Sequence, residues 1–228
     1  MIYENNGFIL FKLLIRTGLM FNKKRQLEIV LQDIPPHQSP KVDLEQYSTP
    51  SFIAADVLWN AYSLGDLEAM KVVDLGCGTG IFTIGSVLMG AIESVGVDID
   101  GDAVAIAEAQ ALKMGLEDCS RFVTNNIKDF KESADTVIQN PPFGAQKASR
   151  KEADRLFMDK SLEIAPVVYS FHIMETEEFV VNFFKKKGAT ISHIYHYNFP
   201  IPQTYNFHKK EKIDVKVLVL RVVRNVNP

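Results

Sequence analysis

The chain of 228 residues is poor in cysteine and has neither a long apolar run nor a strong excess of charge of one sign. Two cysteines, Cys77 and Cys119, cannot form a disulfide framework, so we expect a reduced, cytoplasmic protein. No group of histidines and cysteines has the spacing of a zinc site, which argues against a metal centre. No run of about 18 apolar residues is present, so we expect no membrane-spanning helix. With 46% hydrophobic and 23% charged residues, the composition excludes a disordered tail and indicates a folded domain.

Charged residues are distributed unevenly along the chain, although the formal net charge is only −3. Residues 71–140 carry 5 basic and 11 acidic side chains, a net charge of −6. Residues 141–228 carry 14 basic and 9 acidic side chains, a net charge of +5. The overall charge gives no indication of a nucleic-acid partner, but the basic final third is an asymmetry that a function has to explain.

The first 40 residues differ in pattern from the rest of the chain. Lys12 and Arg16 interrupt the apolar stretch 7–20 and no cleavage site follows it, which argues against a signal peptide. We expect residues 1–19 to be an extension that precedes a translation start at Met20. Residues 20–40 are predicted to form a helical lead-in that stops at a pair of prolines, because proline cannot continue a helix. Residues 41–228 are expected to form one domain.

Short apolar runs alternate with helical patterns from residue 71 onward. This alternation predicts an α/β fold with a seven-stranded, mostly parallel sheet and helices on both of its faces. No helix separates the last two strands, and we expect a long loop over 198–212, which contains Pro200 and Pro202, and hence a C-terminal antiparallel hairpin. The predicted strands span 71–76, 94–98, 121–124, 135–139, 167–173, 190–197 and 213–223. The predicted helices span 79–90, 103–114, 152–165 and 175–187.

A glycine-rich loop, Asp74-Leu-Gly-Cys-Gly-Thr-Gly80, follows the first predicted strand. Its spacing differs from the G-x-G-x-x-G of a dinucleotide site, and Asp74 would repel a phosphate but suit an α-ammonium group. Asp98 ends the second strand, where such folds hold a ribose hydroxyl. Asn126 follows the third strand, where we expect contact with a base edge. A glycine turn that only packs strand on helix is the alternative, but a ligand with these three parts and no phosphate is S-adenosylmethionine.

The fourth predicted strand runs into the segment Asn140-Pro-Pro-Phe143. A rigid turn with a packed phenylalanine would account for it, but parallel strands of such folds also bind ligands at their carboxyl ends. The Asn140 side-chain carbonyl and a proline carbonyl could accept both hydrogens of a planar amino group, leaving the nitrogen lone pair for a methyl group. Phe143 could stack on a base, a contact worth about 1–3 kcal/mol. The segment therefore predicts direct methyl transfer without a metal.

These two segments resemble the cofactor and catalytic motifs of class I amino-methyltransferases, which have a Rossmann-like fold and methylate adenine N6, cytosine N4 or a glutamine amide. Three further segments, Leu44–Thr49, Tyr169–His172 and Tyr205–Lys210, resemble those of the small methyltransferase-like proteins that modify one adenine of small-subunit ribosomal RNA. The resemblance extends over about residues 21–224. It implies a methyltransferase that uses S-adenosylmethionine to methylate N6 of an adenine in structured RNA. A small zinc-binding activator protein, with which eukaryotic members work, is a further partner that it implies.

The motifs and the resemblance together give a set of expected site residues. Eukaryotic members have aspartate at the position of Asn126, from which we expect an altered cofactor affinity and not lost binding. The catalytic residues are expected to be Asn140, Pro141, Pro142 and Phe143. The cofactor residues are expected to be Gln46, Tyr47, Thr49, Asp74, Gly76, Cys77, Gly78, Thr79, Gly80, Asp98, Ile99, Asn126 and Ile127. The substrate residues are expected to be Phe143, Gly144, Lys147, Phe207, His208, Lys209 and Lys210.

Several readings of these residues stay open. Phe207 and His208 could equally pack in the core, and each lysine could be a solvated surface charge, although together the lysines predict a basic surface around Phe143 that holds phosphates. A protein glutamine N5-methyltransferase would use a similar motif, but those enzymes carry a larger N-terminal helical domain. A non-catalytic scaffold that binds S-adenosylmethionine is a second alternative. A nicotinamide dehydrogenase is disfavoured by the glycine spacing.

Overall fold

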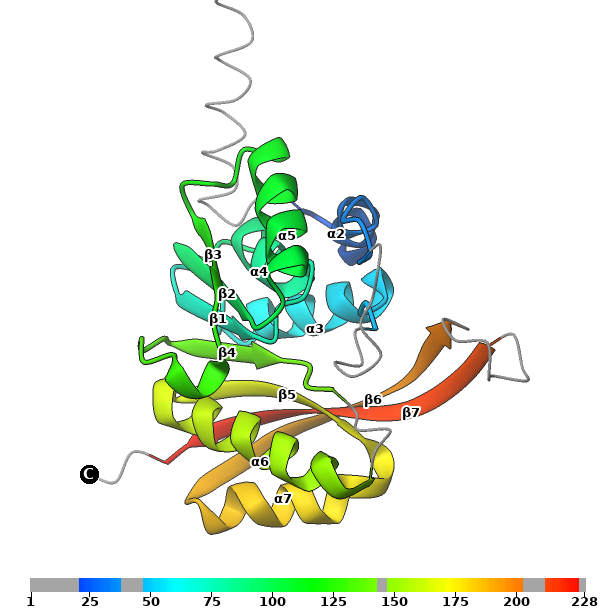
Figure 1. The fold of residues 1–228 in the computed structure, drawn as a ribbon, viewed down its shortest axis with the longest axis vertical. Helices are drawn as coiled ribbons and strands as arrows, with labels where there is room; N and C mark the ends of the chain where they lie inside the picture. Colours follow the sequence, from blue (N-terminus) through cyan, green and yellow to red (C-terminus); the bar gives the residue numbers. More distant parts are fainter. Residues whose placement is uncertain (1–20, 38–46, 143–146, 203–211, 226–228) are drawn as a thin grey trace, which may run out of the picture.

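The computed structural model describes residues 21–37, 47–142, 147–202 and 212–225. The extension predicted over residues 1–19 lies outside them. The strands in this part of the chain are β1 (Lys71–Leu75), β2 (Glu93–Asp98), β3 (Ser120–Thr124), β4 (Thr136–Gln139), β5 (Val167–Ile173), β6 (Ala189–Pro202) and β7 (Lys212–Arg224). They form a seven-stranded sheet in the order β3-β2-β1-β4-β5-β7-β6 (Figure 1).

Two kinds of strand pairing divide the sheet. Strands β3, β2, β1, β4 and β5 pair in parallel, whereas β7 runs antiparallel to both β5 and β6. The predicted α/β fold, a mostly parallel sheet with a C-terminal antiparallel hairpin, is confirmed. None of the described helices is long and apolar enough to cross a membrane.

Helices cover both faces of the sheet, so the core has two parts. Successive strand residues point to opposite faces: Val72 belongs to the first part and Val73 to the second. The helices that pack on the first face are α2 (Lys24–Leu31), α3 (Ser51–Ser63), α4 (Ile81–Leu88) and α5 (Gly101–Lys113). Those on the second face are α6 (Lys147–Ile164) and α7 (Glu177–Lys186), with the short 3₁₀ turns η2 (Ile127–Asp129) and η3 (Met174–Thr176) beside them.

Helix ends follow local chemistry that the sequence already shows. The Asp100 side chain accepts a hydrogen bond from the Asp102 N–H at 3.2 Å and caps the start of α5. Helix α7 begins with acidic residues and ends with lysines, which suits the helix dipole. These ends fix where the loops at the carboxyl edge of the sheet begin and stop.

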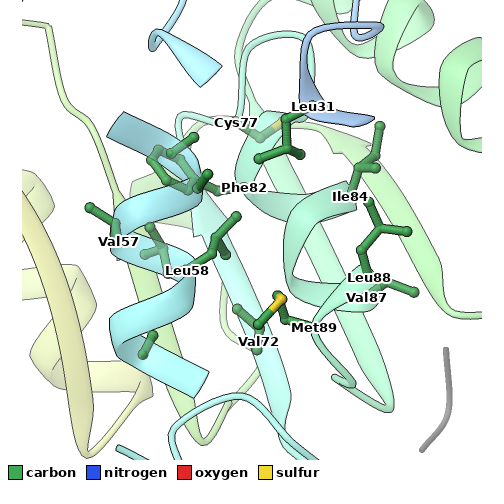
Figure 2. Packing of buried hydrophobic residues seen from close by; sticks show 14 of the residues in the cluster. Leu31, Val57, Leu58, Val72, Cys77, Phe82, Ile84, Val87, Leu88 and Met89 are labelled. Carbon is green, nitrogen blue, oxygen red and sulfur yellow. The ribbon is translucent and has the colours of Figure 1, made fainter. Parts of the chain in front are cut away.

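Helices α3 and α4 pack closely, with apolar side chains such as Leu58 and Phe82 between them (Figure 2). A Cβ atom at Gly85 in α4 would overlap the buried Leu58 side chain, so a larger residue there would force Leu58 to move. Leu31, the last residue of α2, belongs to the same cluster as Cys77 of the glycine loop. The packing therefore brings the lead-in helix to the loop that follows β1.

Two elements differ from the sequence-based expectation. The sequence pattern predicts no element over α3, because the buried residues of this helix are spread around much of its surface and give no single apolar stripe. Strand β6 continues to Pro202, so the loop predicted over 198–212 is wrong for its first five residues. Pro200 still pairs in register with Asp214 of β7, because β6 is the edge strand and proline needs no partner on the open side.

Candidate active site

The carboxyl ends of β1 to β4 surround a cavity of about 440 Å³. The strand order reverses between β1 and β4, which is where open α/β sheets bind ligands. Four loops contribute to the wall: Gly76–Thr79 after β1, Asp98 and Ile99 at the end of β2, Asn125–Ile127 after β3, and Asn140 with Pro142 after β4. The predicted motifs, which are separated by up to about 60 residues, therefore meet at one cavity.

Two further parts of the chain contribute to the wall, and the sequence predicts neither of them there. Leu31, Ile34 and His37 come from the lead-in, and Leu156 and Phe157 come from α6. Apart from His37, they have the sequence pattern of ordinary core residues, because a cavity wall and a core both need apolar side chains. Only the tertiary contact of α2 and α6 with the glycine loop identifies them.

The glycine loop leaves β1 by a sharp turn. Gly76 has a φ of 73°, which favours glycine, and a Cβ atom there would lie 3.2 Å from the ring of Phe157. The Gly76 and Cys77 N–H groups both donate to the carbonyl of Val97, at 2.8 and 3.1 Å. The loop is thus held against the end of β2, and its backbone is open to close approach by a ligand. Cys77 and Thr79 line the cavity beside it.

Asp98 has both carboxylate oxygens fixed by backbone donors. Its Oδ2 accepts the Gly78 N–H at 2.8 Å and its Oδ1 accepts the Asp100 N–H at 2.9 Å. Burial raises the pKa of the Asp98 carboxyl, against the lowering effect of these two hydrogen bonds. Each oxygen of an ionised carboxylate accepts more than one donor, so Asp98 can still bind ligand hydroxyls.

Asp74, which the sequence predicts to bind the ammonium group, is buried near the end of β1. It is 1% exposed, and its Oδ2 accepts two hydrogen bonds from Thr83 in the first turn of α4, at 3.0 Å from the N–H and 2.8 Å from the hydroxyl. Burial raises the pKa of Asp74 to about 7, although the bonds from Thr83 lower it. Asp74 is not among the described residues of the cavity wall, so the direct ammonium contact predicted for it has no support in this geometry. Its carboxyl group ties β1 to α4 and thereby holds the loop between them.

Asn126 lines the cavity next to Ile127, but its side chain also has a local partner. Its Oδ1 accepts the Lys128 N–H at 3.1 Å and caps η2. The side-chain carbonyl, one of the two groups that could contact a base edge, therefore already accepts one hydrogen bond. The Nδ2 group is the other polar end of this side chain.

Asn140 stands at the wall directly after β4. Its Nδ2 donates to the Thr49 hydroxyl at 3.0 Å, over a sequence separation of 91 residues. Its Oδ1 is buried and has no hydrogen-bond partner among the described residues. A buried acceptor without a donor costs free energy, about 1–3 kcal/mol, which a bound donor would recover. The site therefore lacks one N–H or O–H donor at this atom.

The remaining predicted residues divide into three groups. Tyr47, Thr49 and Pro142 line the cavity, whereas Gly80 and Pro141 are buried beside it and do not. Lys147 is the first residue of α6. The predicted residues that lie outside the described part of the chain are Gln46, Phe143, Gly144, Phe207, His208, Lys209 and Lys210.

Comparison with known proteins gives consistent matches. A family model described as the methyltransferase small domain matches residues 53–164. Mettl5 of Drosophila melanogaster, an rRNA N(6)-adenosine-methyltransferase, is 36% identical over 201 residues, which are 86% of this chain and 93% of that protein. An uncharacterised protein of Methanocaldococcus jannaschii is 40% identical over 210 residues, 88% of this chain and 94% of the relative. The crystal structure of PH1948 from Pyrococcus horikoshii has a TM-score of 0.83 at 36% identity and covers 90% of this chain and 100% of that one.

These matches extend over almost the whole length of the relatives, and they contain both the glycine loop and the segment after β4. They confirm the predicted methyltransferase fold and S-adenosylmethionine as the cofactor. The chain belongs to the family of methyltransferases that includes the Drosophila Mettl5 protein.

Proposed function

We propose that this protein transfers a methyl group from S-adenosylmethionine to the N6 amino group of an adenosine in structured RNA, within the small-subunit ribosomal RNA. The observation that carries this proposal is the unpartnered, buried Oδ1 of Asn140 at the wall of the cavity. An exocyclic amine is a donor that such an acceptor can bind. The names of the relatives from Drosophila and Danio rerio, both rRNA N(6)-adenosine-methyltransferases, support adenosine as the target.

The residues present fit the cofactor. Asp98 would accept the ribose hydroxyls, since its carboxylate is held in place by Gly78 and Asp100. Ile99, at 56% exposure, and Ile127 would contact the two faces of the adenine ring. Gly78, which lines the cavity and has open space where a Cβ atom would lie, would admit the amino-acid part, which needs a close approach. S-adenosylmethionine supplies a methyl group bound to a positively charged sulfur.

The chain's own residues would position the amine. Asn140 Oδ1 and the backbone carbonyl of Pro141 would each accept one hydrogen of the amino group, so that the nitrogen lone pair points at the methyl carbon. A nitrogen–carbon bond forms, the carbon–sulfur bond breaks, and the amine then releases a proton to water. Positioning of this kind contributes up to about 7–11 kcal/mol to a reaction barrier when the geometry is good.

Recognition of the RNA would depend on its shape and on unstacking of the target base. Phe143 would stack on the target base. Lys147, Lys209 and Lys210 would contact phosphates, and the basic surface predicted around Phe143 belongs to this proposal. A small zinc-binding activator protein is part of it too. Methylation by the purified chain at the same rate with and without that partner would remove the activator from the proposal.

The decisive experiment compares the wild-type chain with Asn140→Ala. Small-subunit RNA from cells that lack the protein is incubated with labelled S-adenosylmethionine, and its nucleosides are identified by mass spectrometry. We expect N6-methyladenosine at one position with the wild type, and a rate about 100- to 1,000-fold lower with the variant, since a group that stabilises the transition state is lost. Asn198→Ala, at an exposed position of β6, is the matched control and should retain the wild-type rate.

The same reaction run on a release factor separates the main alternative. Label on a glutamine of the protein, with none on the RNA, would replace this proposal by a protein glutamine methyltransferase. Cofactor binding without methylation of either substrate, in the presence of the activator, would favour a scaffold.

A further inference from the structure

We propose that His37 is a positioning residue of the cofactor site: its hydrogen bond to Asp100 holds the lead-in at the wall of the cavity and thereby slows the release of S-adenosylmethionine. The inference rests on the cofactor and not on the proposed RNA target. Neither residue is among the expected site residues, and the two are 63 residues apart in the sequence. The fold brings the end of the lead-in to the turn that follows β2.

The bond between His37 and Asp100 is shielded from water. His37 Nε2 lies 3.1 Å from Asp100 Oδ2, and the two side chains are 7% and 1% exposed. An ionised carboxylate only accepts hydrogen bonds, so the imidazole nitrogen that faces it donates. A hydrogen bond to a charged group is stronger than one between neutral groups. The contact is therefore well suited to hold two segments of the chain together.

Asp100 is also held by bonds that do not involve His37. Its Oδ1 accepts the Asp102 N–H at 3.2 Å in the first turn of α5, and its own N–H donates to Asp98 Oδ1 at 2.9 Å. Asp100 is thus tied to α5 on one side and to the carboxylate expected to bind the ribose on the other. Since Asp98 and His37 line the same cavity, the lead-in is attached next to the ribose site.

The other end of the lead-in is fixed in the core. Leu27 and Leu31 of α2 are buried, and α2 packs against α3 and α4. Leu31 belongs to the same cluster as Cys77 of the glycine loop (Figure 2). The lead-in therefore has an apolar attachment at α2 and a polar attachment at His37.

The segment between these two attachments forms part of the cavity wall. Gln32, Ile34, Pro36 and His37 all line the cavity. Pro35 and Pro36 have fixed φ angles, which stiffens the segment. A ligand that fills the cavity contacts this segment only while the segment is docked. The apparent affinity is then the affinity of the docked state multiplied by the docked fraction, so a bond that keeps the segment docked strengthens cofactor binding.

Three substitutions at His37 separate the hydrogen bond from the bulk of the ring. The amide nitrogen of glutamine stands as far along the side chain as Nε2 of histidine does, whereas that of asparagine stands at the position of Nδ1. His37→Gln can therefore restore the bond to Asp100, and His37→Asn is too short to do so. His37→Phe keeps an aromatic ring and removes the donor.

The readouts are the affinity for S-adenosylhomocysteine by calorimetry and the rate at which labelled S-adenosylmethionine leaves the protein during a chase. We expect His37→Phe and His37→Asn to bind about 10-fold more weakly and to release the label faster, as a docked fraction of about one in ten gives. His37→Gln should stay near the wild type. His196→Phe is the matched control, because His196 also faces a carboxylate, that of Glu177 at 4.0 Å, but at an exposed position of β6.

A double variant tests whether His37 acts through Asp100. Serine is also a preferred N-cap, so Asp100→Ser keeps a cap on α5 and removes the oxygen that faces His37. Adding His37→Phe to Asp100→Ser should cost little further affinity, whereas in the wild type it costs the full amount. Amide hydrogen exchange over residues 32–37 should be faster in His37→Phe than in His37→Gln, because an undocked segment exposes its N–H groups to water.

These measurements need no RNA, so their outcomes are distinct from those of the proposed function. Wild-type affinity and release in His37→Phe would overturn the inference and leave the function in place. A His37→Gln variant as weak as His37→Phe, or an equal cost of His37→Phe with and without Asp100→Ser, would mean that His37 acts by another contact and would also overturn it. Failure of the wild type to methylate RNA would overturn the proposed function alone.

Discussion

At the carboxyl ends of β1, β2 and β4 polar side chains line a cavity, whereas between β5 and β7 buried polar side chains bind one another. Asp98 and Asn140 belong to the first region, and each keeps acceptor capacity that no described residue uses. In the second region, Arg221 donates from Nε and Nη2 to the two oxygens of Asp66, at 2.7 Å each, and the Tyr169 hydroxyl donates to the same carboxylate at 2.6 Å. One region is arranged for a ligand, whereas Asp66, Tyr169 and Arg221 in the other bind one another.

The difference shows that buried polar residues do not by themselves identify a site. Tyr169 belongs to a segment that resembles the family, and its burial and hydrogen bond raise the pKa of its hydroxyl strongly. Its partners, Asp66 and Arg221, nevertheless satisfy it fully and join the hairpin to the loop before β1. Asn140 is only partly buried as a residue, and it has one buried side-chain atom without a hydrogen-bond partner among the described residues. An unsatisfied atom at the wall of a cavity is the better indication of function.

The largest effect is expected from Arg221→Met in the closed region. Its guanidinium is 14% exposed and Asp66 is 7% exposed, so the variant leaves a buried carboxylate without its cation. We expect a loss of about 3–5 kcal/mol in the free energy of unfolding, measured by urea titration. Below the unfolding transition, the affinity for S-adenosylhomocysteine should be that of the wild type.

Arg121→Met is the matched control for this prediction. Arg121 also pairs with two acids, Glu93 and Glu132, but its side chain is 43% exposed. Exposed pairs contribute about 0–1 kcal/mol, so its loss should be small. Equal losses in the two variants, or a weakened cofactor affinity in a folded Arg221→Met protein, would contradict the division into two regions.

An intermediate effect is expected from Asp98→Asn in the open region. The amide nitrogen of the new side chain must face either the Gly78 or the Asp100 N–H group, and it cannot accept from a ribose hydroxyl. A hydrogen bond to a charged group contributes about 1.5–3 kcal/mol, so we expect roughly 10- to 100-fold weaker binding of S-adenosylhomocysteine by calorimetry. Asp159→Asn, on the exposed part of α6, should bind as the wild type does. Unchanged affinity in Asp98→Asn would remove this residue from the cofactor site.

The smallest effects are on the pH dependence of stability. The slope of stability against pH should have opposite signs for Asp74, beside the first region, and for His172, in the second. Burial raises the pKa of Asp74 to about 7, so ionisation costs stability: its contribution is present below pH 3.8 and is lost as pH rises to 7. Burial lowers the pKa of His172 in β5 to about 3, so its contribution is present above pH 6.5 and is lost as pH falls toward 3. One proton gives a slope of at most about 1.4 kcal/mol per pH unit.

Urea titrations between pH 4 and 8 measure these slopes. Relative to the wild type, Asp74→Asn should gain stability as pH rises, because ionisation of the buried Asp74 destabilises the wild type, whereas the amide does not ionise. His172→Gln should gain relative stability as pH falls. Slopes of the same sign, or no change of slope in either variant, would show that burial does not control these two groups.

Some of this protein can be read from local patterns. The alternation of strands and helices and the glycine loop are properties of a few neighbouring residues, and the structure has them where the sequence predicts them. The meeting of the loop with Asp98 and Asn140 also follows, because parallel strands put their carboxyl ends on one edge. Helix α3 and the end of β6 were missed, since burial on several sides and an edge position override the usual patterns.

The sequence by itself determined the fold class, the edge of the sheet that forms the site, and the kind of cofactor, because each depends on short-range order and on the geometry of parallel strands. Only the tertiary structure decided how individual side chains are used there. It turned Asp74 toward Thr83, added the lead-in and α6 to the cavity wall, and paired Asn140 with Thr49. These outcomes depend on contacts between elements far apart in the chain, and a side chain does not carry in its own neighbourhood the information about which distant group it will meet.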